Sequence, residues 1–145
     1  MEHGDMSSEP AITFVRPTQL TAQAPYAYAA VAGPGQFVFT AGACPLDADG
    51  NTVAVGDIAG QAAQVMANLV TALQAAGAQL TDVVKTTIYV ASSQQADLGI
   101  AWHVVRSAFG AHDAPSTLLG VSVLGYDDQL VEVEAVAIRP EPSTI

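Results

Sequence analysis

The alternation of apolar and polar residues along the chain predicts two helices. Apolar residues recur with a helical period over residues 58–76, where Asp57 is placed to cap the first turn and Gly77 follows the last. A second apolar stripe with the same period covers residues 98–109 and ends at Gly110. Each stripe predicts an amphipathic helix that covers a core with one face.

Strands are predicted where β-branched and aromatic residues lie between Pro and Gly, at residues 12–15, 28–31, 37–40 and 84–90. Two further apolar runs, at residues 114–121 and 130–138, are interpreted as a strand pair joined by a polar turn at 125–128. In the last run, alternate residues point to opposite faces. One face then carries Val131, Val133, Ala135 and Ala137, and the other carries Glu132, Glu134, Val136 and Ile138.

This order of elements predicts an α+β domain with one mixed sheet and both helices on a single face. The other face would stay uncovered although it carries apolar residues, which predicts a closed homo-oligomer. A ligand site is then expected where strand ends of neighbouring subunits meet. We assign the folded domain to residues 11–140, with a disordered N-terminus at 1–10 and a short tail at 141–145.

Composition and charge narrow the functions that such a domain could have. Fourteen acidic residues against four basic ones give a formal net charge of -10, which opposes binding to nucleic acid or to anionic membranes. No apolar stretch is long enough to cross a bilayer, and no secretion signal begins the sequence. Cys44 is the single cysteine, so no internal disulfide is possible and a cytoplasmic location is expected.

The motifs along the chain resemble those of the reactive intermediate deaminase (RidA/YjgF) family. The resemblance runs from about residue 24 to residue 139, and it depends on the order of several segments rather than on one decisive motif. These segments are Ala24-Pro25-Tyr26, Gln36 to Gly42 followed by Pro45-Leu46-Asp47, Gly56-Asp57-Ile58 with Gln61, Asn68-Leu69, Leu73 to Gly77, Asp82 to Val90, and Val131 to Ala137.

The resemblance implies a chorismate-mutase-like fold, a homotrimer with a barrel core, and a small-molecule pocket at each subunit interface. It also implies hydrolysis of imines and enamines such as 2-aminoacrylate, without a metal or an organic cofactor. In the family an arginine at the start of the penultimate strand holds the substrate carboxylate as a bidentate pair. The matching position here is Pro115 or Ser116, so we do not expect the standard arginine-dependent activity.

Glu132 is the predicted catalytic residue, because it matches the family glutamate that positions or activates water. The alternative is a strand glutamate that faces solvent or a neighbouring subunit, and for Glu134 the corresponding place at an interface or rim is favoured. Tyr26 matches a tyrosine that closes the pocket, although an amphipathic residue at an interface would also fit. The remaining predicted ligand-binding residues are Ala41, Gly42, Cys44, Trp102, Ser116, Thr117 and Leu118.

Several of these ligand-binding positions have simpler structural explanations. Trp102 lies in an apolar helical stripe and could pack in the core, while strand propensity alone accounts for Thr117. Ala41 stands where the family usually has a serine. Cys44 could act as a nucleophile, but no histidine lies nearby in the sequence and a small buried hydrophobic role is favoured. The three histidines have no metal-ligand partners at useful spacing, so no metal site is predicted.

Three functions are therefore considered from the sequence. The first is a cofactor-independent imine or enamine hydrolase with an altered substrate preference. The second is a binding or accessory protein of the same fold, which holds a reactive metabolite without turnover. The third, a ribonuclease or translation inhibitor, is disfavoured because the acidic chain offers no basic groove to RNA.

Overall fold

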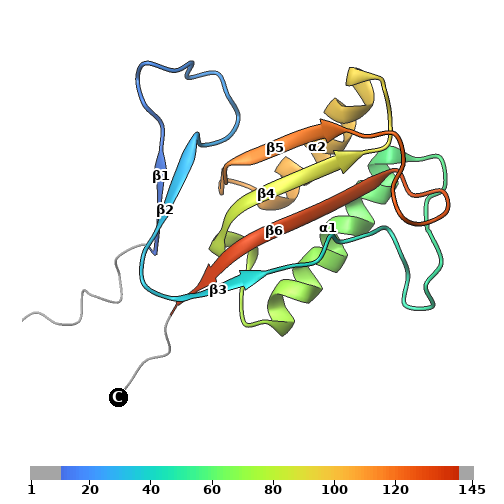
Figure 1. Cartoon of the computed structure of the whole chain (residues 1–145), viewed down its shortest axis with the longest axis horizontal. Coiled ribbons are helices and arrows are strands. Elements are labelled where there is room, and N and C mark those ends of the chain that lie inside the picture. The colour runs from blue at the N-terminus through green and yellow to red at the C-terminus, as the bar shows by residue number, and fades with distance from the viewer. Residues whose placement is uncertain (1–10, 141–145) are drawn as a thin grey trace, which may run out of the picture.

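The computed structural model describes residues 11–140, so the predicted disordered N-terminus and tail lie outside the described residues. The described chain is a mixed α+β unit (Figure 1). In chain order its elements are β1 (Ile12–Val15), β2 (Ala29–Ala32), β3 (Gln36–Phe39), α1 (Ile58–Ala75), the 3-10 helix η2 (Leu80–Asp82), β4 (Val83–Val90), α2 (Gln95–Phe109), β5 (Ser116–Gly120) and β6 (Val131–Arg139).

The main sheet has four strands in the order β3-β6-β4-β5. β4 and β5 run parallel, whereas β6 is antiparallel to both β3 and β4, so the prediction of a mixed sheet is confirmed. The predicted pairing of segments 114–121 and 130–138 is wrong, because β4 lies between β5 and β6. β4 and β5 are joined through α2, the kind of long crossover that parallel strands require, and β5 therefore lies on the far side of β4.

The first two strands form a separate antiparallel ribbon, which corrects the prediction of a single sheet. Ile12 pairs with Ala32 and Val15 with Ala29. The ribbon ends at the Gly33-Pro34-Gly35 segment, where Pro34 cannot donate a ladder hydrogen bond. The chain then enters β3 at the edge of the main sheet, and the ribbon stands beside that sheet (Figure 1).

Both helices cover one face of the main sheet, as the sequence predicts (Figure 1). The side chains of β6 that face the helices are buried, and they pack with Leu69 and Leu73 of α1 and with Val105 of α2 in one core cluster. Asp57 caps α1 by accepting a hydrogen bond from the Gly60 N–H at 3.0 Å. The predicted helix faces and the Asp57 cap are therefore confirmed.

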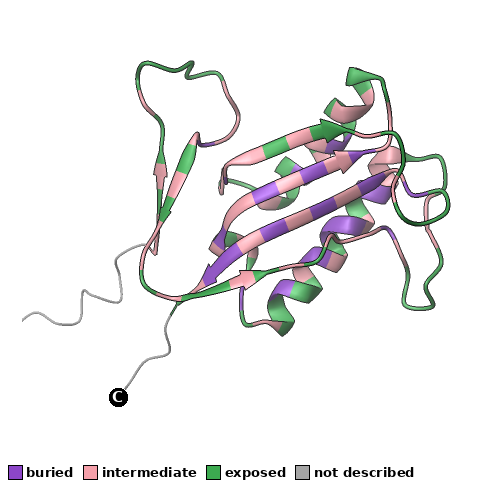
Figure 2. Cartoon of the chain, viewed as in Figure 1, coloured by how far each residue is buried: buried purple, intermediate pink, exposed green. Residues whose placement is uncertain are grey.

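The opposite face of the sheet stays partly exposed within the chain. β6 alternates between buried and half-buried residues from Val131 to Ala137, and Ile138 is buried as well (Figure 2). On this face Phe37 is 59 % exposed and Phe39 is 74 % exposed, while Leu119 of β5 is also exposed. The predicted uncovered face with apolar residues is therefore confirmed, and Glu132 and Glu134 lie on it, half-buried.

Candidate functional site

Glu132 lies near the start of β6, on the face of the sheet away from the helices. Its Oε1 atom accepts two hydrogen bonds, one from Gln129 Nε2 at 3.0 Å and one from the Cys44 thiol at 3.4 Å. No donor among residues 11–140 reaches Oε2, which remains open to solvent. The carboxylate is thus held through one oxygen, and the other is free to accept a proton.

A β-bulge brings the chain after β3 against this carboxylate. Phe39 pairs with Val136 and Ala43 bridges to Val133, so three residues lie between the pairs on one strand and two on the other. Gly42 is in this bulge, where an added Cβ would clash with the Glu132 carboxylate and come within 2.5 Å of its Cδ. The close approach therefore requires glycine at position 42.

The predicted residues at positions 41 and 44 have different relations to this bulge. Ala41 is exposed in the bulge itself. Cys44 is only half-buried and donates to Glu132, which corrects the favoured reading of a buried hydrophobic side chain. Partial burial, followed by the neighbouring Glu132 charge, raises the pKa of the Cys44 thiol to about 11. The thiol is therefore protonated at neutral pH and acts as a donor rather than as a nucleophile.

Two amide side chains on α1 hold the loops around Glu132. Fully buried Gln61 donates to the Asp128 carbonyl at 2.9 Å and accepts from the Leu130 N–H at 2.7 Å. Asn68 donates to the carbonyls of Cys44 and Leu46 at 2.8 and 2.9 Å. The helix thus fixes both loops, whereas the sequence analysis assigned neither amide a role.

Gln129, which orients Glu132, was also missed by the sequence analysis. Its side chain is buried, donates to the Val131 carbonyl at 3.1 Å as well as to Glu132, and accepts from the Tyr126 N–H at 3.1 Å. A single glutamine in a polar turn gives no pattern that distinguishes this role. The one available signal was its position three residues before the predicted catalytic glutamate.

Five predicted ligand-binding residues line one pocket of about 400 Å³ beside β5: Tyr26, Trp102, Ser116, Thr117 and Leu118. Tyr26 and Trp102 form an edge-to-face pair, with ring centroids 6.2 Å apart and an interplanar angle of 87°. Trp102 comes from α2 and Tyr26 from the segment before β2, so helix, sheet and ribbon meet here. The pair gives the pocket an aromatic wall.

The two hydroxyls of this pocket have different partners. Ser116 Oγ accepts from the buried Thr86 hydroxyl at 2.6 Å and donates to the Ala114 carbonyl at 2.9 Å. Thr117 is exposed, and its Oγ1 accepts from Lys85 Nζ at 2.6 Å. The Ser116 hydrogen is therefore used within the chain, whereas the Thr117 hydrogen remains available to a ligand.

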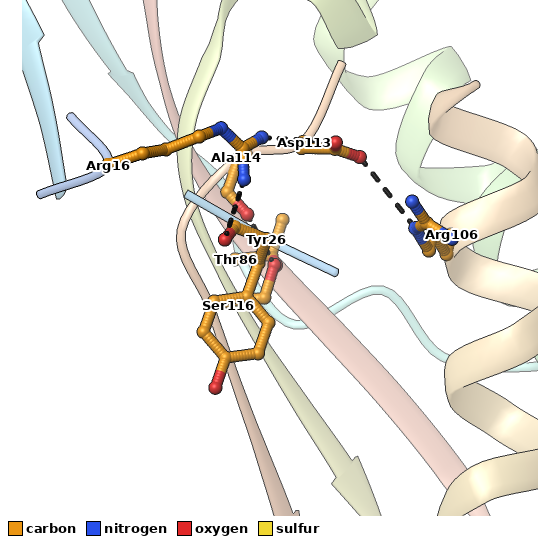
Figure 3. Close-up of polar contacts among 7 residues, drawn as sticks. All are labelled: Arg16, Tyr26, Thr86, Arg106, Asp113, Ala114 and Ser116. Carbon is orange, nitrogen blue, oxygen red and sulfur yellow. Dashed lines mark hydrogen bonds and ion pairs between the residues drawn. The ribbon is translucent and has the colours of Figure 1, made fainter. Parts of the chain in front are cut away.

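An arginine latch holds the segment that carries Tyr26 (Figure 3). Arg16 donates to the Tyr26 carbonyl and to Asp113 Oδ2, both at 3.1 Å. Asp113 also accepts a backbone bond from Ala27 at 2.9 Å, and Arg106 Nε lies 3.7 Å from its Oδ1. The latch ties the ribbon to the loop that leads into β5, although 97 positions separate Arg16 from Asp113.

Glu132 and the predicted residues beside it, Ala41, Gly42 and Cys44, are called the Glu132 group. This group and the β5 pocket lie at different strands of the same sheet. Glu132 is on β6, while the pocket is beside β5, with β4 between the two strands. Two strand spacings amount to roughly 10 Å. A larger groove of about 680 Å³ opens instead next to Gly42 and Cys44, and Tyr126 and Asn68 also line it. Within one chain, the predicted residues therefore form two separate groups.

Glu134 lies two residues further along β6 and has its own partner. The Tyr89 hydroxyl donates a hydrogen bond to Glu134 Oε1, and this bond raises the pKa of Tyr89. Neither residue lines the β5 pocket. The arrangement agrees with a structural role for Glu134 on the open face.

Residues 11–140 contain no group of three or more His, Cys, Asp or Glu side chains that could hold a metal ion. In the same range, neither helix has the length and apolar character that a membrane crossing would need.

Comparison with solved structures relates this fold to known proteins. A protein of unknown function of the Rid family from Yersinia pestis aligns with a TM-score of 0.84 and 28 % identity, covering 90 % of this chain and 100 % of that one. The YjgF gene product of E. coli aligns with a TM-score of 0.62 and 30 % identity, over 81 % of this chain and 91 % of that one.

Sequence comparison points to the same group of proteins. A RutC family protein of Pyrococcus horikoshii is 36 % identical over 115 residues, which cover 79 % of this chain and 87 % of the relative. The 2-iminobutanoate/2-iminopropanoate deaminase of Salmonella typhimurium is 32 % identical over 108 residues, covering 72 % and 81 %. Residues 17–139 match the family described as endoribonuclease L-PSP. The chain therefore belongs to the endoribonuclease L-PSP family, the family of the RidA/YjgF proteins.

Proposed function

We propose that the protein hydrolyses imines or enamines of small metabolites, with Glu132 holding and activating the attacking water. The observation that carries the proposal is the way in which the Glu132 carboxylate is hydrogen-bonded. Oε1 accepts bonds from Gln129 and Cys44, while Oε2 has no described donor and is open to solvent. A carboxylate oriented in this way can accept a proton from water at a fixed position. The deaminase of Salmonella typhimurium, 32 % identical, acts on imines and supports the reaction class.

The chemistry needs only water and this base. Water adds to the C=N carbon of the protonated imine while Glu132 Oε2 takes one of its protons, and a carbinolamine forms. The Glu132 carboxyl then gives this proton to nitrogen. As the C–N bond breaks, the carbinolamine hydroxyl gives its proton to the carboxylate, and ammonia leaves with a carbonyl compound as the other product. No oxidant, reductant or cofactor enters this balance.

We further propose that the working site is shared between copies in a homotrimer. The pocket beside β5 lacks a general base, and the Glu132 group lies on another strand of the same chain. A cyclic arrangement repeats one contact between two different surfaces, so it can bring the β5 side of one copy to the β3 side of the next. The exposed Phe37 and Phe39 on the open face would be covered by the same assembly.

Pro115 and Ser116 stand at the start of β5, and the family resemblance implies a carboxylate-binding arginine at one of these two positions. We therefore propose that the protein is not an arginine-dependent 2-aminoacrylate deaminase of the standard kind.

The test is ammonia release from freshly generated 2-iminopropanoate and from an imine without a carboxylate. We expect the native protein to accelerate hydrolysis of at least one of them, and Glu132→Gln to lower that rate by about 10²-fold or more. Glu134→Gln is the matched control, because it makes the same change two residues away on the same face. Equal rates for native protein and Glu132→Gln would contradict the proposal.

A second candidate is a binding or accessory protein without turnover. It is favoured by the aromatic pair of Tyr26 and Trp102, which can hold an apolar ligand without a catalytic group. No acceleration of either imine, together with saturable binding at this pocket, would support it. Ribonuclease activity is disfavoured by the net charge of -10.

A further inference from the structure

The pocket beside β5 has no charged side chain in its lining. The five residues that line it are aromatic, aliphatic or hydroxyl-bearing: Tyr26, Trp102, Ser116, Thr117 and Leu118. A carboxylate that enters such a pocket loses bound water and gains no ion pair in return. A neutral ligand avoids this cost. The lining therefore favours a ligand without a carboxylate.

The basic side chains near the pocket have partners within the chain. Arg16 and Arg106 both point toward Asp113, at distances of 3.1 and 3.7 Å from its carboxylate oxygens (Figure 3). Lys85 lies outside the lining, and its ammonium donates to the exposed Thr117 hydroxyl at 2.6 Å. An ion pair formed by an exposed lysine contributes little in water. None of these three cations therefore gives a ligand in the pocket a desolvated ion pair.

Two aromatic rings and Leu118 supply the contact surface of the pocket. Tyr26 and Trp102 are half-buried and meet edge to face, with their centroids 6.2 Å apart and an interplanar angle of 87°. Part of each ring remains accessible, so a third ring can pack against the pair in one of the geometries that aromatic groups prefer. The volume of about 400 Å³ lies in the range of small-molecule sites, roughly 300 to 1,000 Å³. The pocket therefore has room for one ring with a short side chain.

Uncharged hydrogen-bonding groups complete the pocket. The Thr117 hydroxyl accepts from Lys85 and keeps its hydrogen to donate. β5 is an edge strand, and its flanking Pro115 carbonyl and Val121 N–H both bond to β4. Alternate residues of a parallel strand bond to the same neighbour, so the backbone N–H and C=O of Leu118 face away from β4. A C=N–H group, which accepts at its lone pair and donates its hydrogen, finds both kinds of partner here.

We propose that the pocket selects imines that carry an aromatic ring and no carboxylate, the class that forms when a primary arylalkylamine is oxidised. Such an amine, R–CH2–NH2, loses two electrons and two protons to the acceptor of the oxidising enzyme and becomes R–CH=NH. Water then converts R–CH=NH to R–CHO and ammonia. The protein therefore acts after an amine-oxidising step and releases an aromatic aldehyde. This reaction rests on the proposed function, but the binding preference does not.

The test is a binding experiment with two compounds of nearly the same shape. 2-Phenylacetamide is neutral, whereas phenylacetate carries a carboxylate in place of the amide. Trp102 is the one tryptophan of the chain and lines the pocket, so its fluorescence reports binding. We expect the amide to bind about tenfold more tightly than the acid, or better, because a carboxylate without a partner is costly to desolvate. Most of the preference should persist in about 0.5 M salt, since salt screens repulsion by the net charge of -10 but not a local loss of hydration.

Variants assign the preference for a ring to the aromatic wall. Tyr26→Leu keeps the fluorescent Trp102 and an apolar side chain, and it should weaken 2-phenylacetamide binding by about fivefold to tenfold. Trp102→Leu, followed by calorimetry, should give a loss of the same size. Binding of hexanamide, which has no ring, should change by less than about twofold in either variant. Phe14→Leu is the matched control, because Phe14 lines a different pocket with Asp82 and His112, and it should leave both affinities unchanged.

The results separate this inference from the proposed function. Binding of neither compound, equal or tighter binding of phenylacetate, or a preference that vanishes in salt would overturn the inference. Equal losses for 2-phenylacetamide and hexanamide in both wall variants would overturn it as well. Faster hydrolysis of 2-iminopropanoate than of the imine that an amine oxidase forms from 2-phenylethylamine would keep the proposed function and contradict the inference. If 2-phenylacetamide binds as expected while neither imine is hydrolysed, the proposed catalysis fails and the ligand preference stands.

Discussion

The two groups of predicted functional residues differ in how the chain supports them. In the Glu132 group, Gln129 donates a hydrogen bond to the Glu132 carboxylate itself. Gln61 and Asn68 hold the loops around it through hydrogen bonds to backbone carbonyls. The β5 pocket is an open surface with an aromatic wall, and the Thr117 hydroxyl keeps a hydrogen that it can donate to a ligand. The first group has the rigidity expected of a reacting carboxylate, and the second has the accessibility expected of a ligand-binding surface.

The largest effect that separates the two groups is expected from Gly42→Ala. The new Cβ would clash with the Glu132 carboxylate, so the side chain must leave its position. Imine hydrolysis should fall by about 10²-fold, as for Glu132→Gln, while binding of 2-phenylacetamide at the β5 pocket should be unchanged. Gly99→Ala is the control, because an added Cβ there meets nothing within 4 Å. Unchanged activity in Gly42→Ala would show that the close approach has no functional importance.

Removal of the buried amide on α1 should cost stability. Gln61→Leu leaves the Leu130 N–H and the Asp128 carbonyl without this partner, and the free energy of unfolding should fall by about 2 kcal/mol or more. Gln64→Leu, on the same helix, loses a single bond to Asn68 and should cost less than about 1 kcal/mol. Urea denaturation of the two variants measures the difference, and equal losses would contradict the role of Gln61 in holding the loop before β6.

The Cys44 thiol should react slowly with iodoacetamide. Its pKa lies at about 11 against 9.0 for an ordinary thiol, so the reactive thiolate forms only as the pH rises toward 11. At pH 8 alkylation should be about tenfold slower than for an unperturbed cysteine, after allowance for the greater nucleophilicity of the more basic thiolate. Glu132→Gln removes the neighbouring negative charge and should speed the reaction. An ordinary rate in the native protein would refute the assigned contact.

The smallest effect is expected at the arginine latch. Arg16→Met removes the bond to the Tyr26 carbonyl and should weaken ligand binding at the pocket about threefold, since exposed pairs contribute little. Stability should change by less than about 1 kcal/mol. Arg139→Met is the control, because Arg139 binds Gln36 at the end of β6 and has no contact with the Tyr26 segment or with Asp113. Equal binding by Arg16→Met and native protein would show that the arginine latch does not contribute to ligand binding at the pocket.

Periodicity predicted those elements that bury one face along their whole length. The helix at 58–76 and the alternation of β6 appear in the structure almost as predicted, because a helical or strand period leaves a direct pattern in the sequence. The pairing of β5 was predicted wrongly, since strands adjacent in sequence often pair and the crossover through α2 gives no local signal. The separation of the first ribbon depended likewise on contacts beyond its own residues.

The candidate site was predictable only in part, for a related reason. Family resemblance identified residues such as Tyr26 and Trp102, which the structure brings together at one pocket. The residues that support the two groups are single polar side chains with distant partners. Arg16 reaches Asp113 across 97 positions, and Gln61 reaches Leu130 across 69. No local period or motif marks such contacts.

The central claim is that the two groups complete one site between neighbouring copies. The most direct test co-expresses two inactive variants, Glu132→Gln and Thr117→Phe, the second of which fills the pocket. In a randomly mixed cyclic trimer, about a quarter of the shared sites combine an intact pocket with an intact glutamate from the next copy. We expect ammonia release at about a quarter of the native rate. No activity in the mixture, with an active native protein and correctly assembled variants, would contradict a shared site.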